Sequence, residues 1–321
     1  MGVQEDLTVA KTYYEKACNL NNKDSCYNLG LYFKYSEQYQ QANKYFQMAC
    51  SMDSDEGCVY LGIAYENGLG IEKDYNKART YYDKACNFNN SVGCYNLGVL
   101  YYKGLGIRQD NQLANKYFTK ACSLEYGMGC TVLGHLYENG YGIEFNYQLA
   151  KTYYEKACNF DDGLGCRNLG YLYANGLGIK QNYHEAKKYY EKSCMLNEYT
   201  GCSNLGILYA QGLGTMQDFQ QAEKLYKKSC NQNEGNGCNG LGVLFLNGEG
   251  VKQDYHQALD YFEKSCNLNI GMGCFNAGTL YDSGQGVRKD KSTAKKYLGK
   301  ACDLGVQNGC NEYRELNEQG Y

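Results

Sequence analysis

The 321-residue chain lacks several features that would point to a particular function. It has no proline and no tryptophan, which we attribute to genome bias and which indicate no particular chemistry. No run of about 18 apolar residues occurs, so the sequence predicts no transmembrane span. The 32 basic and 35 acidic residues are mixed without blocks of one sign, and the net charge is −3. We therefore expect no nucleic-acid partner and no membrane-surface partner.

Motifs for metals and cofactors are missing as well. Structural zinc sites need cysteines a few residues apart, and no Cys-x-x-Cys occurs. The three histidines, His135, His184 and His256, stand in different repeats. The Gly-x-Gly triplets, from Gly68/Gly70 to Gly284/Gly286, have neither the third glycine nor the strand of a dinucleotide fingerprint. The sequence therefore predicts no metal site and no cofactor.

The chain does contain eighteen cysteines, arranged in nine pairs with seven residues between the members of each pair. From Cys50 onward the pairs recur every 36 positions. A fixed period of this length is typical of one supersecondary unit stacked on copies of itself. We expect a single repeat array without a separate catalytic domain.

Residues 74–106 illustrate the repeat. Apolar residues fall at helical spacing in two blocks, which predicts two short amphipathic helices. The segment between the blocks is rich in Asn, Ser and Gly, and it predicts a tight turn. The triplet Gly104-Leu105-Gly106 ends the second helix. The unit is predicted to be an αα-hairpin.

Small residues recur at two positions of this unit. Alanine stands eight residues before the first cysteine in all nine copies, and glycine stands four residues after the second cysteine in eight of nine. Helix axes approach closely only where side chains are small, so these positions are predicted helix crossings. Aromatic residues such as Tyr81 and Tyr82 are expected to fill the space around them.

This pattern resembles tetratricopeptide repeats and, more closely, Sel1-like repeats. The matching residues are Leu97, Gly98 and Tyr101, then Ala114, Phe118 and Ala121, with the longer Gly-x-Gly loop of the Sel1-like type between them. The resemblance implies an all-α, right-handed αα-solenoid. We expect an N-terminal helix and turn in 1–25, a capping helix in 310–321, and eight repeats in 26–57, 58–93, 94–129, 130–165, 166–201, 202–237, 238–273 and 274–309.

The cysteine pairs resemble those of the secreted cysteine-rich Sel1-like proteins of Helicobacter and related bacteria, in which each hairpin is bridged. The resemblance implies a disulfide within each pair, worth roughly 2 to 3 kcal/mol by chain entropy. The implied bridges are Cys18-Cys26, Cys50-Cys58, Cys86-Cys94, Cys122-Cys130, Cys158-Cys166, Cys194-Cys202, Cys230-Cys238, Cys266-Cys274 and Cys302-Cys310.

Such cysteine usage also indicates an oxidising compartment, and we expect a secreted or periplasmic protein. The first residues, Met1 to Asp6, show no signal peptide. We interpret this as a signal peptide that was removed, with a starting Met-Gly supplied in its place. A cytosolic protein with reduced thiols is the alternative.

The same resemblance raises an enzymatic alternative, because the family has been linked to penicillin binding and weak β-lactamase activity. That chemistry requires Ser-x-x-Lys together with S-D-N and K-T-G elements. One Ser-x-x-Lys occurs, Ser292 to Lys295, but neither of the other two elements follows. We predict no catalytic residue and keep weak β-lactamase activity as the alternative function.

The preferred hypothesis is an interaction module with a concave groove, as tetratricopeptide arrays have. In those arrays an asparagine before Leu-Gly holds a peptide main chain, since an amide both donates and accepts. The alternatives are an asparagine that only caps or bridges helices, and a protein that is only a structural spacer. We expect a monomer that binds a peptide, a protein or a peptidoglycan-like ligand, possible host proteins included. The predicted groove residues are Asn28, Asn96, Asn168, Asn204, Asn276, Tyr27, Tyr95, Arg167, His135 and Tyr171.

The disulfide prediction can be tested by mass spectrometry. The intact mass should be lower than that of the reduced chain by 18 hydrogens, one for each cysteine. Peptide mapping should recover only pairs of neighbouring cysteines. Free thiols in natively exported protein would contradict the prediction.

Overall fold

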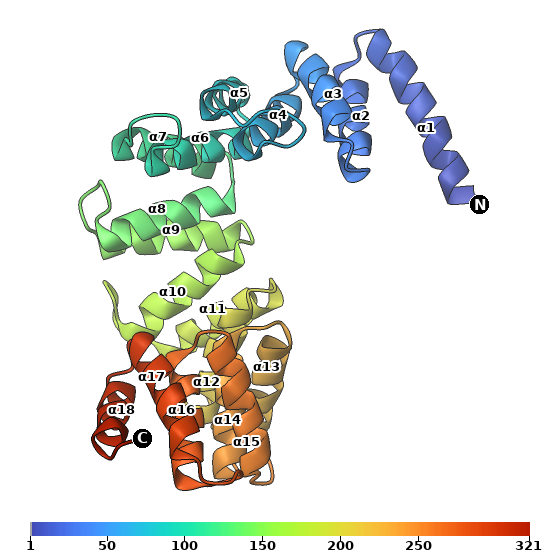
Figure 1. Ribbon diagram of the computed structural model, residues 1–321. Helices are drawn as coiled ribbons and strands as arrows, with labels where there is room; N and C mark the ends of the chain where they lie inside the picture. Colours follow the sequence, from blue (N-terminus) through green and yellow to red (C-terminus); the bar gives the residue numbers. More distant parts are fainter. Residues whose placement is uncertain (1) are drawn as a thin grey trace. The chain divides into compact units, whose positions relative to one another are not determined.

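The computed structural model describes the backbone of residues 2–321 and the side chains from Val9 onward. Met1, on which the interpretation of a removed signal peptide partly rests, lies outside these residues. The described residues form eighteen α-helices and no strand (Figure 1). They belong to two compact units, Met1–Phe160 and Asp161–Tyr321.

The helices of the first unit are α1 Gly2–Asn19, α2 Lys23–Tyr35, α3 Tyr39–Ser51, α4 Asp55–Asn67, α5 Tyr75–Asn87, α6 Ser91–Lys103, α7 Asn111–Ser123, α8 Gly127–Asn139 and α9 Tyr147–Asn159. Those of the second are α10 Gly163–Asn175, α11 Tyr183–Met195, α12 Tyr199–Gln211, α13 Phe219–Asn231, α14 Gly235–Asn247, α15 Tyr255–Asn267, α16 Gly271–Ser283, α17 Lys291–Asp303 and α18 Gln307–Glu318. Within each unit every helix contacts the next. Each unit is thus an α-solenoid of helix pairs, which confirms the predicted fold class.

Two kinds of connection alternate along the chain. Odd-numbered helices lead into even-numbered ones through a short turn spanned by a cysteine pair. Even-numbered helices from α4 onward lead into odd-numbered ones through a Gly-x-Gly loop. A repeat can be defined as two helices joined by the cysteine-bridged turn or as two helices joined by the Gly-x-Gly loop. The repeat boundaries predicted from the sequence therefore stay a prediction.

The short turns carry the disulfide bridges. Eight pairs, all but the fifth, have Cα atoms 4.5–4.7 Å apart, within the normal range for a disulfide. Cys158 and Cys166 are also disulfide-bonded. The turn residue before each even helix up to α16 adopts a left-handed conformation, as at Asn89 with φ 61°. The bridge therefore fixes the angle at which an even helix leaves the preceding odd helix.

The Gly-x-Gly loops require both of their glycines. Gly104 ends α6 in the left-handed conformation with φ 67°, where glycine is preferred. Gly106 also has a positive φ, and a Cβ atom there would lie 2.4 Å from Tyr75 Cβ at the start of α5. The loop then returns through a hydrogen bond from Asp110 N to Tyr101 O, and the Asp110 carboxylate caps α7. The loop thereby packs against the preceding helix pair.

The glycines inside the even helices lie at the crossings. A Cβ atom on each of these eight glycines would come within 2.4–2.8 Å of a side chain from the following odd helix. That side chain is an aromatic ring in seven copies, such as Phe118 against Gly98, and Leu298 in the last. At Gly170 the backbone oxygen of Ala186 is close as well, so the predicted alanine also borders the crossing.

A lysine connects one helix pair to the next. Five lysines two residues before the first cysteine of a pair donate to the backbone oxygen of the first cysteine of the preceding pair, at 2.6–2.9 Å. They are Lys84, Lys120, Lys228, Lys264 and Lys300. The acceptor oxygen lies at the end of an odd helix, where a positive charge is favourable.

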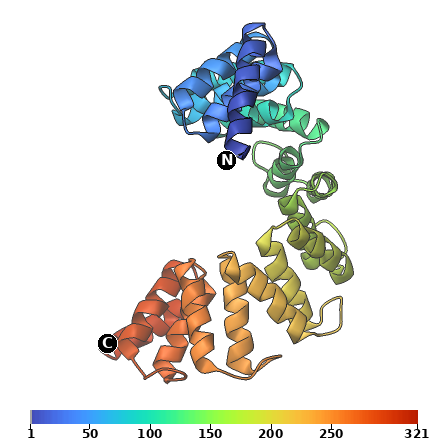
Figure 2. The ribbon, with the colours of Figure 1, turned by 90° about the vertical axis from the view of Figure 1, so that its right-hand side faces the viewer.

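The even-numbered helices form one layer and the odd-numbered helices the other. In the first unit α2 contacts α4 and α4 contacts α6, and in the second the same holds along α10, α12, α14 and α16. Figures 1 and 2 show the helices of the second unit standing side by side in these two layers. The surface of the even-numbered helices is where the sequence analysis places the groove residues.

The glycine crossing gives a testable prediction. Gly98→Ala should lower the free energy of unfolding by about 1–3 kcal/mol, because the methyl group would overlap the Phe118 ring. Gly299→Ala in α17 is the control, since only the half-exposed Tyr313 ring approaches there, at 3.2 Å. It should be neutral or gain up to about 1 kcal/mol in helix propensity. Equal effects in urea unfolding would contradict the proposed role of the crossing.

Candidate functional site

Four positions of each even helix lie on one side, because they are spaced by four, three and four residues. They stand two residues before and two, five and nine residues after the second cysteine of the pair. In α10 they are Leu164, Asn168, Tyr171 and Asn175, and in α12 Thr200, Asn204, Ile207 and Gln211. We call this surface the asparagine stripe. It contains the predicted asparagines together with His135 and Tyr171.

Four of the five predicted asparagines have unused hydrogen-bonding groups. Within the described part of the chain, no hydrogen bond occupies the side-chain amides of Asn28, Asn96, Asn168 and Asn204. All four are half-buried, so they are held by their helices yet reach solvent. Asn28 also lines a cavity of ≈340 Å³ with Tyr14 and Tyr35.

The fifth asparagine is used inside the protein. Asn276 Nδ2 on α16 donates to Asn239 Oδ1 on α14 at 3.0 Å. This contact matches the alternative interpretation, in which the asparagine bridges neighbouring helices. The remaining positions of the register hold Tyr60, Val132, Gly240 and Glu312.

Arg167, next to Asn168 on α10, holds an unused donor. Its Nε atom is buried and finds no acceptor among the described residues. The guanidinium group lies near the hydroxyl of Tyr190. Burial raises the pKa of Tyr190, and the positive charge of Arg167 lowers it. Tyr190 is 4% exposed, and its hydroxyl group donates no hydrogen bond within the described chain. Unsatisfied buried donors are rare, so this part of α10 is suited to an acceptor from a ligand.

Apolar side chains surround these polar groups. Leu164, Tyr171 and Ile207 are 38%, 46% and 39% exposed in the second unit. Met128 on α8 and Met272 on α16 are also exposed at the first position of the stripe. Alternating amides and exposed apolar groups can contact the main chain and the side chains of one ligand.

The predicted aromatic residues of the first unit are mostly packed. Tyr27 lies against Phe46 and Tyr60, and burial with the nearby Tyr60 raises the pKa of Tyr27 to about 12. Tyr95 packs on Phe118 and Tyr126. His135 is exposed on α8 beside the ring of Tyr141. Tyr27 and Tyr95 therefore support the helix layer more than they offer free surface.

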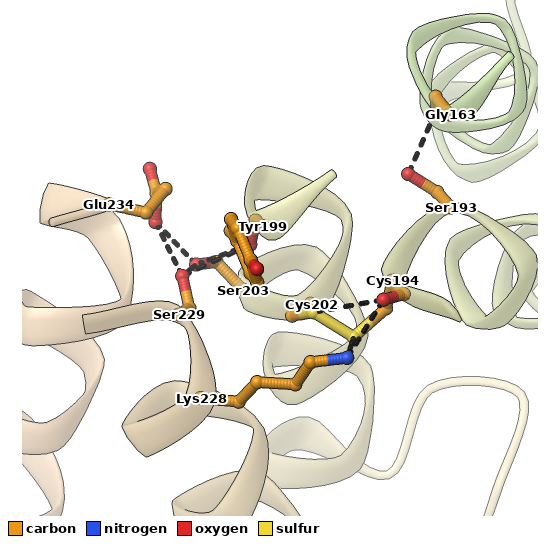
Figure 3. The surroundings of a disulfide bond; sticks show 9 residues. All are labelled: Gly163, Ser193, Cys194, Tyr199, Cys202, Ser203, Lys228, Ser229 and Glu234. Atoms are coloured by element: carbon orange, nitrogen blue, oxygen red, sulfur yellow. Dashed lines mark hydrogen bonds between the residues drawn. A yellow bond between two sulfur atoms is a disulfide. The ribbon is translucent and has the colours of Figure 1, made fainter. Parts of the chain in front are cut away.

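A cluster of serines with a glutamate resembles a reactive site but is closed. Figure 3 shows Ser203, Ser229 and Glu234 facing one another from α12, α13 and the turn before α14. The two hydroxyl oxygens are 2.6 Å apart, and Glu234 Oε2 lies 2.5 and 3.0 Å from them. Both serines are fully buried, and Glu234 also accepts from Gly237 N at 2.9 Å. The cluster joins three helices and offers no accessible nucleophile.

The Ser-x-x-Lys motif stands at the other end of the second unit. Ser292 and Lys295 line a surface pocket of ≈480 Å³. Lys295 Nζ donates to Asn317 Oδ1 at 2.7 Å and to the backbone oxygen of Tyr321, and it lies over the Tyr313 ring. No hydrogen bond between Ser292 and Lys295 is present in the described structure. The lysine thus binds α18 and the following residues instead of activating the serine.

Metal and membrane sites are not found in the described residues. No group of three or more His, Cys, Asp or Glu side chains there is arranged to hold a metal ion. None of the described helices combines the length and the apolar character needed to cross a bilayer.

The sequence analysis missed two polar features. The lysine contacts had a readable signal, because lysine stands two residues before the first cysteine in eight of nine copies. The serine and glutamate cluster had none, since its members come from three helices and only packing brings them together.

The buried cluster predicts a loss of stability on mutation. Ser229→Ala should lower the free energy of unfolding by about 1–3 kcal/mol, because Ser203 and Glu234 would lose a partner. The hydroxyl group of the exposed Ser292 makes no hydrogen bond within the described chain, so Ser292→Ala should leave stability unchanged. Thermal unfolding of the two variants would show the difference, and equal midpoints would exclude a stabilising role for the cluster.

The chain is similar to proteins of known structure. A protective antigen present in uropathogenic Escherichia coli strains is 26% identical with a TM-score of 0.79, over 97% of this chain and 68% of the antigen. A Sel1 repeat protein from Oxalobacter formigenes is 27% identical with a TM-score of 0.70, over 77% of this chain and 99% of that protein. Cysteine rich protein B of Helicobacter pylori is 36% identical over 42% of this chain and 98% of its own, with a TM-score of 0.34. No curated protein sequence matches the chain.

The Sel1 repeat family model matches nine times, at residues 1–22, 23–54, 55–87, 91–126, 127–159, 163–198, 200–234, 235–270 and 271–306. These matches span nearly the whole chain; the first covers α1, and each of the other eight coincides with an even helix and the odd helix that follows it. The chain therefore belongs to the Sel1 repeat family, whose members are protein-interaction scaffolds.

Proposed function

We propose that the asparagine stripe of the second unit binds an extended peptide segment of a partner protein. The observation that carries this proposal is the pair of unoccupied amides of Asn168 and Asn204 beside the buried, unpaired Nε of Arg167. Asn96 offers an equivalent amide in the first unit.

An extended main chain fits these groups chemically. Each of its peptide units presents one N–H and one C=O, and an asparagine amide complements both. The Arg167 guanidinium group carries donors only, so it suits a carbonyl or carboxylate oxygen of the ligand. Exposed Leu164, Tyr171 and Ile207 would contact the side chains of the peptide.

The disulfides support a location outside the cytoplasm. All eighteen cysteines are bonded, and such bridges persist in oxidising compartments. We propose that the protein acts in the periplasm or after secretion, where partner proteins, host proteins or peptidoglycan-like material are available.

Binding to a library of decapeptides tests the proposal. The double variant Asn168→Ala/Asn204→Ala should bind the selected peptides about tenfold more weakly, because two neutral hydrogen bonds are lost at about 0.5–1.5 kcal/mol each. Asn231→Ala is the matched control, since this asparagine is exposed at the end of α13 on the other helix layer. It should leave affinity unchanged.

Soluble peptidoglycan fragments serve as a second probe. If these fragments bind and the peptides do not, the proposal is wrong about the ligand. If the double variant and Asn231→Ala bind peptides as tightly as the unmodified protein, the asparagine stripe is not the binding surface. Circular dichroism should confirm that all variants keep their helices.

A further inference from the structure

A cavity of ≈390 Å³ opens on the asparagine stripe between α12 and α14. Ile207 and Gln211 line it from α12, and Asn236, Gly240 and Val243 line it from α14. Its volume lies at the lower end of the range for ligand pockets, about 300–1,000 Å³. It is therefore suited to one long side chain of a larger ligand.

The cavity exists because Gly240 stands where neighbouring copies have asparagine. Asn204 and Asn276 occupy the same register on α12 and α16. A Cβ atom on Gly240 would lie 2.7 Å from the ring of Tyr226. Because Gly240 has no side chain, the ring of Tyr226 is accessible from the surface through the cavity.

The hydroxyl group of Tyr226 lacks the glutamate partner that two equivalent tyrosines have. Tyr82 donates to Glu66 at 2.6 Å, and Tyr154 donates to Glu138 at 2.5 Å. In the register of these glutamates, the helix that precedes Tyr226 carries Ala210. No hydrogen bond to the Tyr226 hydroxyl occurs within the described residues.

The Gly-x-Gly loop beside the cavity carries a glutamate. The middle residue of the Gly-x-Gly loop is leucine in four other copies, at Leu69, Leu105, Leu177 and Leu213, and here it is Glu249. Glu249 lines the cavity and is half-buried, and its carboxylate has no salt bridge or hydrogen bond in the described structure. Its charge adds to the effect of burial in raising the pKa of Tyr226, so the two groups lie close together.

Unused acceptors line the cavity, together with the unused side-chain N–H donors of Gln211 and Asn239. Asn236 Nδ2 donates to Glu234, and Gln217 Nε2 donates to the backbone oxygen of Ala210. The side-chain carbonyl oxygens of Asn236 and Gln217 are therefore unpaired within the described residues. None of the residues that line the cavity is Lys, Arg or His. The rings of Phe219 and Tyr226 add surface that a cation can contact.

We propose that this cavity binds a lysine or arginine side chain of the extended peptide, with Glu249 as its counter-ion. The peptide part of this inference rests on the proposed function, whereas the recognition of a cationic side chain rests on the cavity alone. Gly240 and Glu249, which differ from the residues of the neighbouring copies, together with Ala210 distinguish this position from the rest of the stripe.

The test uses two small probes, Nα-acetyl-lysine methylamide and Nα-acetyl-norleucine methylamide, whose side chain lacks the ammonium group. In amide NMR titrations, the lysine probe should shift signals around Gly240 and Glu249, and the norleucine probe should bind about tenfold more weakly, as expected for one lost charged hydrogen bond. Glu249→Gln should remove this preference while keeping the shape of the loop. Glu249→Leu, which restores the residue of other copies, should do the same.

Asp260→Asn is the control for net charge, because Asp260 is exposed on α15 and does not line the cavity. It should keep the preference for the lysine probe. Equal binding of both probes, or an unchanged preference in Glu249→Gln, would overturn the inference.

The decapeptide library separates this inference from the proposed function. If the protein selects decapeptides with a basic residue at one position, and Glu249→Leu loses this selection, both the peptide groove and the cation-binding cavity are supported. Lysine-probe binding without any peptide binding supports the cavity and refutes the peptide groove. Peptide binding without a basic preference refutes the cavity and leaves the groove standing.

Discussion

The packing of every repeat depends on a bulky side chain lying against a glycine of the neighbouring even helix. Phe118 on Gly98 and Tyr154 on Gly134 are two instances of this contact. A side chain on the glycine would separate the two helices, because its Cβ atom would overlap the ring. From α4 to α16, the disulfide at one end of each even helix and the Gly-x-Gly loop at the other then hold the helix at this crossing. Other contacts of the fold are arranged around these three constraints.

Most polar chemistry of the odd helices is used to join repeats. Lys120 and its equivalents donate to a helix-terminal oxygen of the preceding pair. Ser193 and Ser265 donate to the backbone oxygens of Gly163 and Gly235, at positions where other copies have alanine. Because these groups are satisfied inside the protein, they are unavailable for catalysis. Among the described residues, the half-buried side-chain amides without a partner lie instead on the even helices, which is the physical basis for assigning binding to that layer.

Differences between copies carry the functional information. The repeat sets a scaffold in which each position has a common residue and a common partner. Gly240 and Glu249 depart from that scaffold, and they meet Ala210 at one cavity. Each change alone would remove a contact or leave a charge unpaired. Together they remove internal contacts and leave a pocket lined by a carboxylate. Such a pocket fits a binding role better than a packing role.

The resemblance to cysteine-rich Sel1-like proteins implied the cysteine pairing, and the sequence by itself determined the helix pairs and the crossing glycines, because these follow from local periodicity and from spacing that recurs along the chain. It also located the asparagine register, through the resemblance of Leu97-Gly98 and its neighbours to a known repeat. It did not distinguish Asn276, which is bonded to Asn239, from Asn168 and Asn204, whose amides are unused. Tertiary structure alone decided these points, and it alone brought Ser203, Ser229 and Glu234 together and Glu249 to the cavity beside Tyr226. The reason is that such contacts join side chains from different helices, and their geometry depends on how one repeat is rotated and packed against the next.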